Sequence, residues 1–368
     1  MWAMIVKEFR QLRRDRRTLA MMIVLPVVLL VVFGYAASFD VSTIPTVVAG
    51  PAAAQAPLRA PFQVVDRAPA EGAAWAQNEV RDGHAAVAVV TGTRTVVLID
   101  GSQLFTAKAA LSALQAGRTH PTGGPAPQVR VLYNPGLKTS FIMIPGLAGV
   151  VLVFVGIIIT SLGVVRERQT GTLEQLAVMP LRPRDVFLGK IVPYFAVAAA
   201  DLAIVLAVGV ALFGVPFRGS YAVFALGALL FLFVTLGIGV LISSVSENQG
   251  QAIQMSFMFT LPQVLLSGLI FPLSSIAVGV RWISYILPLT YFNEISRGVM
   301  LRAEPIGPLW PPLLFLALLG LVVMTLAMLR FRSYLGPAGS GGGRSDAAGA
   351  PGAAEAPDPA AAAVAESR

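Results

Sequence analysis

Six long apolar runs, which contain a single charged residue between them, limit the folds open to this chain. A helix that crosses a hydrocarbon core about 30 Å thick needs roughly 20 residues, and each run meets or approaches that length. The composition agrees, with 56% hydrophobic and 12% charged residues. We predict an α-helical integral membrane protein whose six transmembrane helices fall in these runs: Leu19 to Phe39, Phe141 to Val165, Ile191 to Phe213, Tyr221 to Ile242, Ala252 to Phe271 and Pro312 to Leu329.

The distribution of Lys and Arg predicts how these helices are oriented, because short cytoplasmic segments carry an excess of both residues. Residues 1–18 and 166–190 are basic, Arg330 and Arg332 follow the last run, and the loop after the third run holds only Arg218. We therefore expect a multi-pass protein of the cell (inner) membrane with both termini in the cytoplasm. The net charge of +8 then reflects membrane orientation, and no nucleic-acid partner is expected.

The two ends of the chain are predicted to differ from its membrane core. Residues 1–18 place an apolar stripe opposite basic residues, which favours an amphipathic helix in the cytoplasmic interface. The run 19–39 exceeds the signal-peptide core of about 7 to 15 residues, so a transmembrane helix is preferred to a cleaved signal. Residues 332–368 are rich in Gly, Ala and Pro, and this composition favours a disordered cytoplasmic tail.

Residues 40–140 are too polar for lipid and long enough to fold on their own. Strands are expected at TVVAG, FQVVD, AAVAVV and TVVLID, and helices at EGAAWAQNEVRDG and TAKAALSALQAG. This alternation predicts a small α/β domain inserted after the first membrane helix, and the orientation places the domain outside the cytoplasm. Its histidines, His84 and His120, have no second ligand at metal-binding spacing, so no metal site is predicted.

The sequence contains no motif that carries catalysis. The phosphate loop GxxxxGK[ST] and the motifs HExxH and GxSxG are absent, and NPGLKTS at residues 134–140 departs from the phosphate loop. There is no cysteine, which excludes disulfides and thiolate metal sites. We predict that this chain is not an enzyme, with no catalytic residues and no cofactor of its own.

Residues 166–190 interrupt the apolar sequence with a charged segment that can form a short helix. Thr172 suits the N-cap position, Gln175 completes a capping box, and Glu174 complements the helix dipole. Pro180 ends the helix after an apolar stripe formed by Leu173, Leu176 and Ala177. A helix this short is marginal in water. It therefore needs the membrane interface, its own bundle or a soluble partner to lie on; a solvated connector is the alternative.

The same segment, RERQTGTLEQLAVMPLRPRDVFLGKIVPY, resembles the cytoplasmic loop of type-2 ABC exporter permeases. VLYNPGLKTSFIMIPGLAGVVL, RDGHAAVAVV and VVLIDGSQ are similar to the subfamily with a large extracytoplasmic domain after the first transmembrane helix. LSGLIFPLSSIAVGVRWISYILPLTYFNEISRGVM is similar to the region that follows the fifth helix in such permeases. Two features depart from the pattern: Ala277 stands where such permeases often have proline, and the C-terminal tail has no counterpart.

This resemblance implies a permease subunit that exports a hydrophobic or amphipathic substrate, such as a drug or lipid. ATP and Mg would bind to a separate cytoplasmic ABC ATPase subunit, and a second permease copy or homologue would complete a dimer in the membrane lipid. A periplasmic adaptor protein is a further partner that the resemblance leaves open. The residues implied to couple to the ATPase are Arg166, Glu167, Gly171, Thr172, Leu173, Glu174 and Leu176.

Two other classes of protein compete with the exporter. A secondary transporter should show internal repeats with broken helices in matching positions, and no second half is evident here. A membrane-anchored extracytoplasmic binding or scaffold protein would explain the inserted domain but would not need five further spans. Copurification with an ATPase subunit separates the three hypotheses.

Polar residues within the predicted spans mark a candidate translocation path. Asp201 is the charged residue of the third run, and a charge at that depth must face the protein interior or water or be protonated. Three roles stay open for it: a hydrogen bond to Gln254 or Gln263, a hydrogen bond across a dimer interface, or a contact with cargo.

Residues 272–311 fit neither a span nor a simple loop, and we expect a re-entrant hairpin of short helices at the outer interface. The hairpin is equally well explained as a gate over an exit or as an aromatic belt resting in lipid. The candidate gate residues are Trp282, Tyr285, Tyr291 and Glu294.

Overall fold

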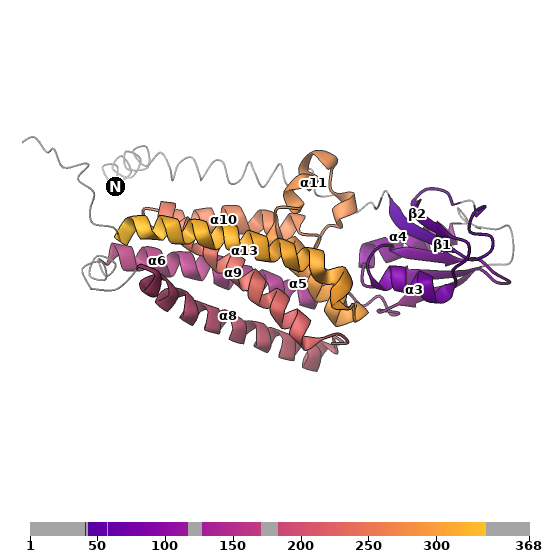
Figure 1. Ribbon diagram of the computed structural model, residues 1–368, viewed down its shortest axis with the longest axis horizontal. Helices are drawn as coiled ribbons and strands as arrows, with labels where there is room; N and C mark the ends of the chain where they lie inside the picture. The colour runs from indigo at the N-terminus through magenta and orange to yellow at the C-terminus, as the bar shows by residue number, and fades with distance from the viewer. Residues whose placement is uncertain (1–40, 42, 57, 117–126, 171–182, 336–368) are drawn as a thin grey trace, which may run out of the picture. The chain divides into compact units, whose positions relative to one another are not determined.

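The computed structural model describes residues 41, 43–56, 58–116, 127–170 and 183–335 (Figure 1). The predicted interfacial helix (1–18), the first predicted span (19–39), most of the predicted coupling loop (171–182) and the tail from residue 336 lie outside the described residues.

A five-stranded sheet forms from residues that precede the second apolar run. Its strands lie in the order β2-β1-β3-β4-β5; β3 and β4 pair antiparallel and the other neighbours pair parallel. The four strands expected from the sequence are present, and β5 is an additional strand that the sequence reasoning missed. The bounds are β1 Ile44–Ala49, β2 Phe62–Ala68, β3 Val87–Val90, β4 Val96–Asp100 and β5 Gln128–Leu132.

Helices α3 (Ala73–Arg81) and α4 (Leu104–Gln115) cover opposite faces of this sheet. Successive strand residues point to opposite faces, so Val47 joins the core beneath α3, whereas Val48 joins the core beneath α4. Because both faces are covered, the central strands can be apolar at nearly every position. The expected helices are therefore confirmed at these two places.

Four helices in the described part of the chain are long and apolar enough to cross a membrane. The first, Thr139–Gln169, joins α5 (Thr139–Val153), the π-helix η1 (Phe154–Ile159) and α6 (Thr160–Gln169). The others belong to α8 (Pro183–Phe213), α9 (Tyr221–Val245) and α13 (Ile306–Leu335). They coincide with the second, third, fourth and sixth predicted runs.

The last helix is longer than the sequence predicted. It begins at Ile306 rather than Pro312 and passes through Pro311 and Pro312, which neighbouring helices make tolerable in a membrane bundle. It also continues to Leu335, beyond the predicted start of the tail at residue 332. The first glycine and proline after it in the sequence are Gly336 and Pro337.

Helix α10 (Gln249–Leu266) occupies the fifth predicted run but is shorter and more polar than the four membrane-length helices. The prediction extended this run to Phe271, whereas the helix ends at Leu266 and Gly268 adopts a left-handed conformation with φ of 78°. Glycine tolerates this conformation because it has no Cβ. The chain turns here into the predicted hairpin.

The hairpin consists of short helices, as expected. They are η2 (Leu273–Ser275), α11 (Val278–Ser284), α12 (Pro288–Arg297) and the π-helix η3 (Gly298–Arg302). Helix α12 packs into the bundle, where the Phe292 ring stacks on Phe231 of α9 with 4.6 Å between centroids. The hairpin ends where α13 begins, at Ile306, and not at residue 311.

Small residues let the membrane helices approach closely. Helix α9 packs against α13 and against η1 and α6 (Figure 1). A Cβ at Gly156 would overlap Thr235, and one at Gly239 would overlap the Gly156 carbonyl, so glycine is required on both sides of this contact.

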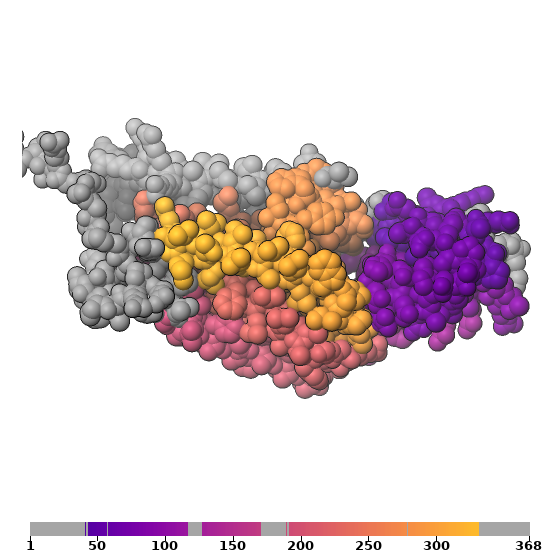
Figure 2. Space-filling view, in the orientation of Figure 1, coloured from indigo at the N-terminus to yellow at the C-terminus, as the bar shows by residue number. Residues whose placement is uncertain are grey.

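Helix α13 forms much of the surface seen in Figure 2, and many of its exposed side chains are large and apolar, as lipid contact requires: Leu314, Phe315, Leu318, Leu321 and Val322.

Single cysteines at Gly92 and Glu247 test the predicted orientation, because both positions are exposed and the natural chain has no cysteine. A membrane-impermeant maleimide added to intact spheroplasts should label Gly92→Cys. It should reach Glu247→Cys only after lysis, since that position lies in the loop predicted to face the cytoplasm. Labelling in the reverse order would contradict the orientation derived from Lys and Arg.

Candidate functional site

Arg302 forms a buried charge cluster with two carboxylates. Its Nη2 atom lies 2.6 Å from Oε2 of Glu304, and its Nη1 atom lies 3.6 Å from Oδ2 of Asp100. The side chains are almost fully buried, with exposed fractions of 7% for Arg302, 3% for Glu304 and 0% for Asp100. Since Asp100 ends β4 and Arg302 ends η3, the cluster joins the five-stranded sheet to the hairpin.

Local backbone geometry brings these groups together. Ala303 has a φ of 52°, and the Glu304 amide donates to the Gly298 carbonyl at 3.0 Å, so the chain reverses directly after η3. A Cβ at Gly298 would overlap the Glu304 carboxylate, which therefore depends on this glycine. On the other side, the Ser102 amide donates to Oδ1 of Asp100 at 2.8 Å and fixes that carboxylate.

Burial shifts the pKa values around the cluster. It raises the pKa of the Glu304 carboxyl above its ordinary value, although Arg302 acts in the opposite direction. Burial alone would lower the pKa of Arg302, but Asp100 and Glu304 outweigh it and raise that pKa. Burial and the charge of Asp100 raise the pKa of Tyr133 to about 12. Arg302 therefore stays cationic and the neighbouring phenol stays neutral at physiological pH.

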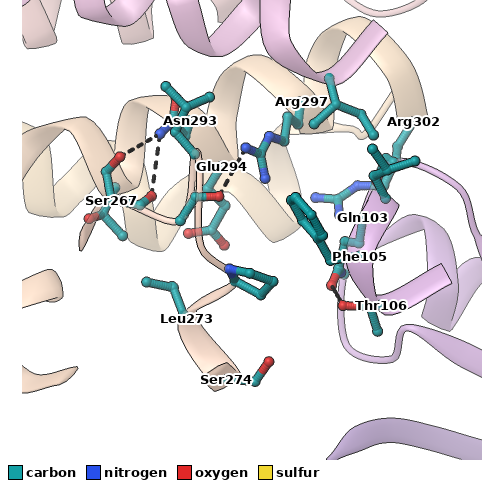
Figure 3. A pocket seen from close by; sticks show the side chains of 18 of the residues that line it. Gln103, Phe105, Thr106, Ser267, Leu273, Ser274, Asn293, Glu294, Arg297 and Arg302 are labelled. Atoms are coloured by element: carbon teal, nitrogen blue, oxygen red, sulfur yellow. Dashed lines mark hydrogen bonds between the residues drawn. The ribbon is translucent and has the colours of Figure 1, made fainter. Parts of the chain in front are cut away.

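A pocket of about 300 Å³ lies between the start of α4 and the hairpin (Figure 3). The α/β domain contributes Gln103, Phe105 and Thr106, and the turn after α10 contributes Ser267 and Leu273. Helix α12 adds four polar side chains, and the end of η3 adds one more: Thr290, Asn293, Glu294, Arg297 and Arg302. The pocket is therefore built by both parts that the charge cluster holds together.

The candidate gate residues lie on the hairpin but do not form one group. Trp282 and Tyr285 are exposed, and the Trp282 indole donates to the Gly279 carbonyl in its own helix. The Tyr291 ring stacks on Phe315 of α13 with 4.5 Å between centroids. Only Glu294 lines the pocket, together with Arg297.

The candidate translocation residues are also separated. Asp201 is partly buried on α8, which packs against α5, η1, α9 and α13. Gln254 and Gln263 lie on α10, which packs against α6, η1, α9, α11 and α12. Within the described residues, no hydrogen bond joins Asp201 to either glutamine. The first of its three proposed roles therefore finds no support in the structure.

Helix α10 carries a stripe of buried polar residues that the sequence reasoning recognised only in part. Ser256, Thr260, Gln263 and Ser267 recur every three or four residues, which places them on one helical face, and their exposed fractions are 2% or less. The Ser256 hydroxyl lies 2.9 Å from that of Ser161 on α6. Among the described residues, the side-chain polar atoms of Thr260 and Gln263 have no hydrogen-bond partner.

Two of the predicted coupling residues, Arg166 and Glu167, form the last turns of α6. The Thr170 hydroxyl shares its one hydrogen between the Arg166 and Glu167 carbonyls, each 3.1 Å away, at the end of the helix. The Gln249 side chain, at the start of α10, donates to the Gln169 side chain at 3.0 Å. The other five predicted coupling residues lie outside the described residues: Gly171, Thr172, Leu173, Glu174 and Leu176.

The sequence analysis did not identify the cluster of Asp100, Arg302 and Glu304, nor did it single out Arg297. Arginines in an otherwise apolar hairpin were the available signal, since such residues are retained in a membrane protein only with a partner. Their partner, Asp100, ends a strand far away in the sequence.

Residues 16–329 match the family described as ABC-2 family transporter protein. The chain belongs to this family. It is 36% identical over 196 residues to the probable multidrug ABC transporter permease YbhR of Escherichia coli K12, covering 52% of this chain and 53% of that protein. It is 32% identical over 209 residues to the probable multidrug ABC transporter permease YbhS of the same strain, covering 56% and 55%.

A more distant relative is the ABC transporter G family member 20 of Dictyostelium discoideum. It is 28% identical over 169 residues, which is 46% of this chain and 23% of that protein. The chain spans about half the length of the bacterial relatives that it matches. Membership of the ABC-2 family, together with the four membrane-length helices among the described residues, identifies a multi-pass membrane protein.

Asp201→Asn tests what the charge on α8 does in this ABC-2 family member. Because Asp201 has no partner in the described part of its own chain, we expect its carboxylate to act on a second permease copy or on cargo. The variant should therefore either weaken self-association in detergent or reduce export of cations relative to neutral compounds between pH 6 and 8. Asp66→Asn, on an exposed strand, is the control. Unchanged association and unchanged selectivity would rule out both roles.

Proposed function

We propose that the chain is the transmembrane permease subunit of an ATP-driven exporter, which moves a hydrophobic or amphipathic substrate such as a drug or lipid out across the inner membrane. The observation that carries this proposal is the family match over residues 16–329, which includes all four membrane-length helices. The printed names of YbhR and YbhS, as probable multidrug ABC transporter permeases, favour a drug-like substrate.

The energy source in this proposal is a separate subunit. No phosphate loop occurs in the sequence, so ATP and Mg would bind to a cytoplasmic ABC ATPase. Two permease copies, or this chain and a homologue, would form a dimer in the membrane lipid with both termini in the cytoplasm. Six membrane passages would result if residues 19–39 and α10 also cross, and the α/β domain would then lie outside the cytoplasm, where a periplasmic adaptor could bind it.

The contacts of α6 support a route from the ATPase to the membrane helices. The predicted coupling helix directly follows Thr170, so a force on it acts first on the end of α6. The Gln169–Gln249 hydrogen bond connects this end to the start of α10. Helix α10 carries the buried polar stripe and leads to the turn at Gly268 beside the pocket. Movement at the loop would therefore reach the outer hairpin through a single helix.

Leu173→Asp or Leu176→Asp should uncouple ATP hydrolysis from export. A charge in the apolar stripe of the coupling helix cannot be buried against the ATPase without a large desolvation penalty. In proteoliposomes with the partner ATPase, we expect hydrolysis to continue while vanadate-sensitive transport is lost. Gln175→Glu adds a negative charge to the same segment but keeps the capping box, and it should transport normally.

Two results would contradict this proposal. Full transport by both aspartate variants, with normal insertion and ATPase binding, would exclude the coupling role of the loop. ATP hydrolysis by the purified chain alone would exclude the proposal that a separate subunit hydrolyses the ATP.

A further inference from the structure

Arg297 is a cation without a counter-ion in the described part of the chain. Its Nη2 atom donates to the Gly268 carbonyl at 3.0 Å, and its buried Nε atom has no hydrogen-bond partner. Arg302, by contrast, meets two carboxylates. A buried guanidinium that lacks an anion is strongly destabilising, and arginine pairs well with carboxylate and phosphate groups. Within the described residues, the Arg297 guanidinium therefore has no carboxylate in direct contact, and an added anion could supply that contact.

The side chain of Arg297 lines the pocket shown in Figure 3. Other polar atoms there also lack partners among the described residues: the Ser102 hydroxyl, just before α4, which can donate a hydrogen bond, and Oδ1 of Asn293 on α12, which can only accept one. A hydroxyl and a guanidinium can both donate to one anion. The pocket therefore has unused hydrogen-bonding capacity from both of the parts that form it.

One part of the pocket wall is apolar. Phe105 from α4 and Leu269, Pro272 and Leu273 from the turn after α10 line the same space. A simple inorganic anion would leave these surfaces in contact with water. A ligand that joins an anionic head to an apolar body would cover them and gain the free energy of burying apolar surface.

Glu294 limits the charge that the ligand can carry. It lines the same pocket and lies one helical turn before Arg297. Asp100 and Glu304 are two carboxylates against the single charge of Arg302, so Arg302 has no excess positive charge for a ligand. One arginine can therefore balance one negative charge, and a doubly charged phosphate monoester would be repelled.

We propose that this pocket binds the singly charged anionic head of an amphiphile, a phosphodiester or a carboxylate, with Arg297 as its counter-ion and Phe105 and Leu273 in contact with its apolar body. The ligand would be either a membrane lipid or an exported compound of the same chemistry. Occupation of the site does not require export, so a binding measurement on the purified chain tests it even if the proposed function fails.

The test titrates the full chain in neutral detergent with dioctanoyl phosphatidylglycerol, which carries one phosphodiester charge, and with uncharged dioctanoylglycerol. Native mass spectrometry counts the bound molecules. We expect the phosphatidylglycerol to bind at least about tenfold more tightly, which corresponds to about 1.4 kcal/mol. Arg297→Gln should abolish this preference, Arg297→Lys should keep part of it, and Lys108→Gln, which removes an exposed cation from α4, should leave it unchanged.

A second variant covers the case in which Arg297→Gln fails to fold. Ser274→Trp keeps every charge but places a bulky ring at the pocket wall, and it should block the phosphatidylglycerol while leaving Arg297 intact. The proposal is overturned if the parent chain binds both probes equally, or if folded Arg297→Gln and Ser274→Trp both bind the anionic probe as the parent does.

The same measurement on the complex with its ATPase distinguishes the two sources of ligand. Bound phosphatidylglycerol that is released when ATP is added, and retained with vanadate, identifies an exported compound. Phosphatidylglycerol that stays bound under both conditions identifies a resident membrane lipid. Both results require an occupied pocket and therefore support the site.

Discussion

Arg302 carries a charge that is buried between Asp100 at the end of β4 and Glu304 in the loop that leads to α13. Removing such a cation from water costs several kcal/mol unless carboxylates and hydrogen bonds compensate for the loss. Deleting one partner of a buried pair leaves the other charge uncompensated, at a cost of about 3 to 5 kcal/mol. The sheet and the hairpin therefore cannot separate at this point without either exposing these charges to solvent or leaving them buried without a counter-ion. Leu104, Ile142 and Leu301 add a small apolar cluster beside them.

This junction determines what the neighbouring elements can do. The pocket exists because α4 starts next to the cluster and α12 ends next to it, so its two walls are held by one set of charges. Helix α10 approaches the same place from the opposite end of the bundle, through the turn at Gly268, whose carbonyl accepts a hydrogen bond from Arg297. In an exporter of the proposed kind, a movement that begins at the cytoplasmic loop would reach the outer domain here.

Much of the fold follows from periodicity in the sequence. The apolar runs located the four membrane-length helices, and the alternation of strand and helix patterns located β1 to β4, α3 and α4. The strand β5 was missed because its residues, QVRVL, are polar at alternate positions and follow a proline-rich stretch. The end of α10 was misplaced because Gly268 turns the chain in a left-handed conformation, and the start of α13 was misplaced because Pro311 and Pro312 lie inside the helix. The charge cluster was missed because only tertiary folding brings Asp100 to Arg302.

A double-mutant cycle between Asp100 and Arg302 tests the central claim, that this buried contact joins the α/β domain to the membrane hairpin. Asp100→Asn, Arg302→Gln and the double variant are compared with the parent by equilibrium unfolding in detergent. The structure predicts a coupling free energy of at least about 1 kcal/mol, because Arg302→Gln alone leaves two buried carboxylates without a counter-ion, whereas the double variant leaves only Glu304 without one. Free energies of unfolding that simply add, to within about 0.3 kcal/mol, would show that the two side chains do not interact and would contradict the account.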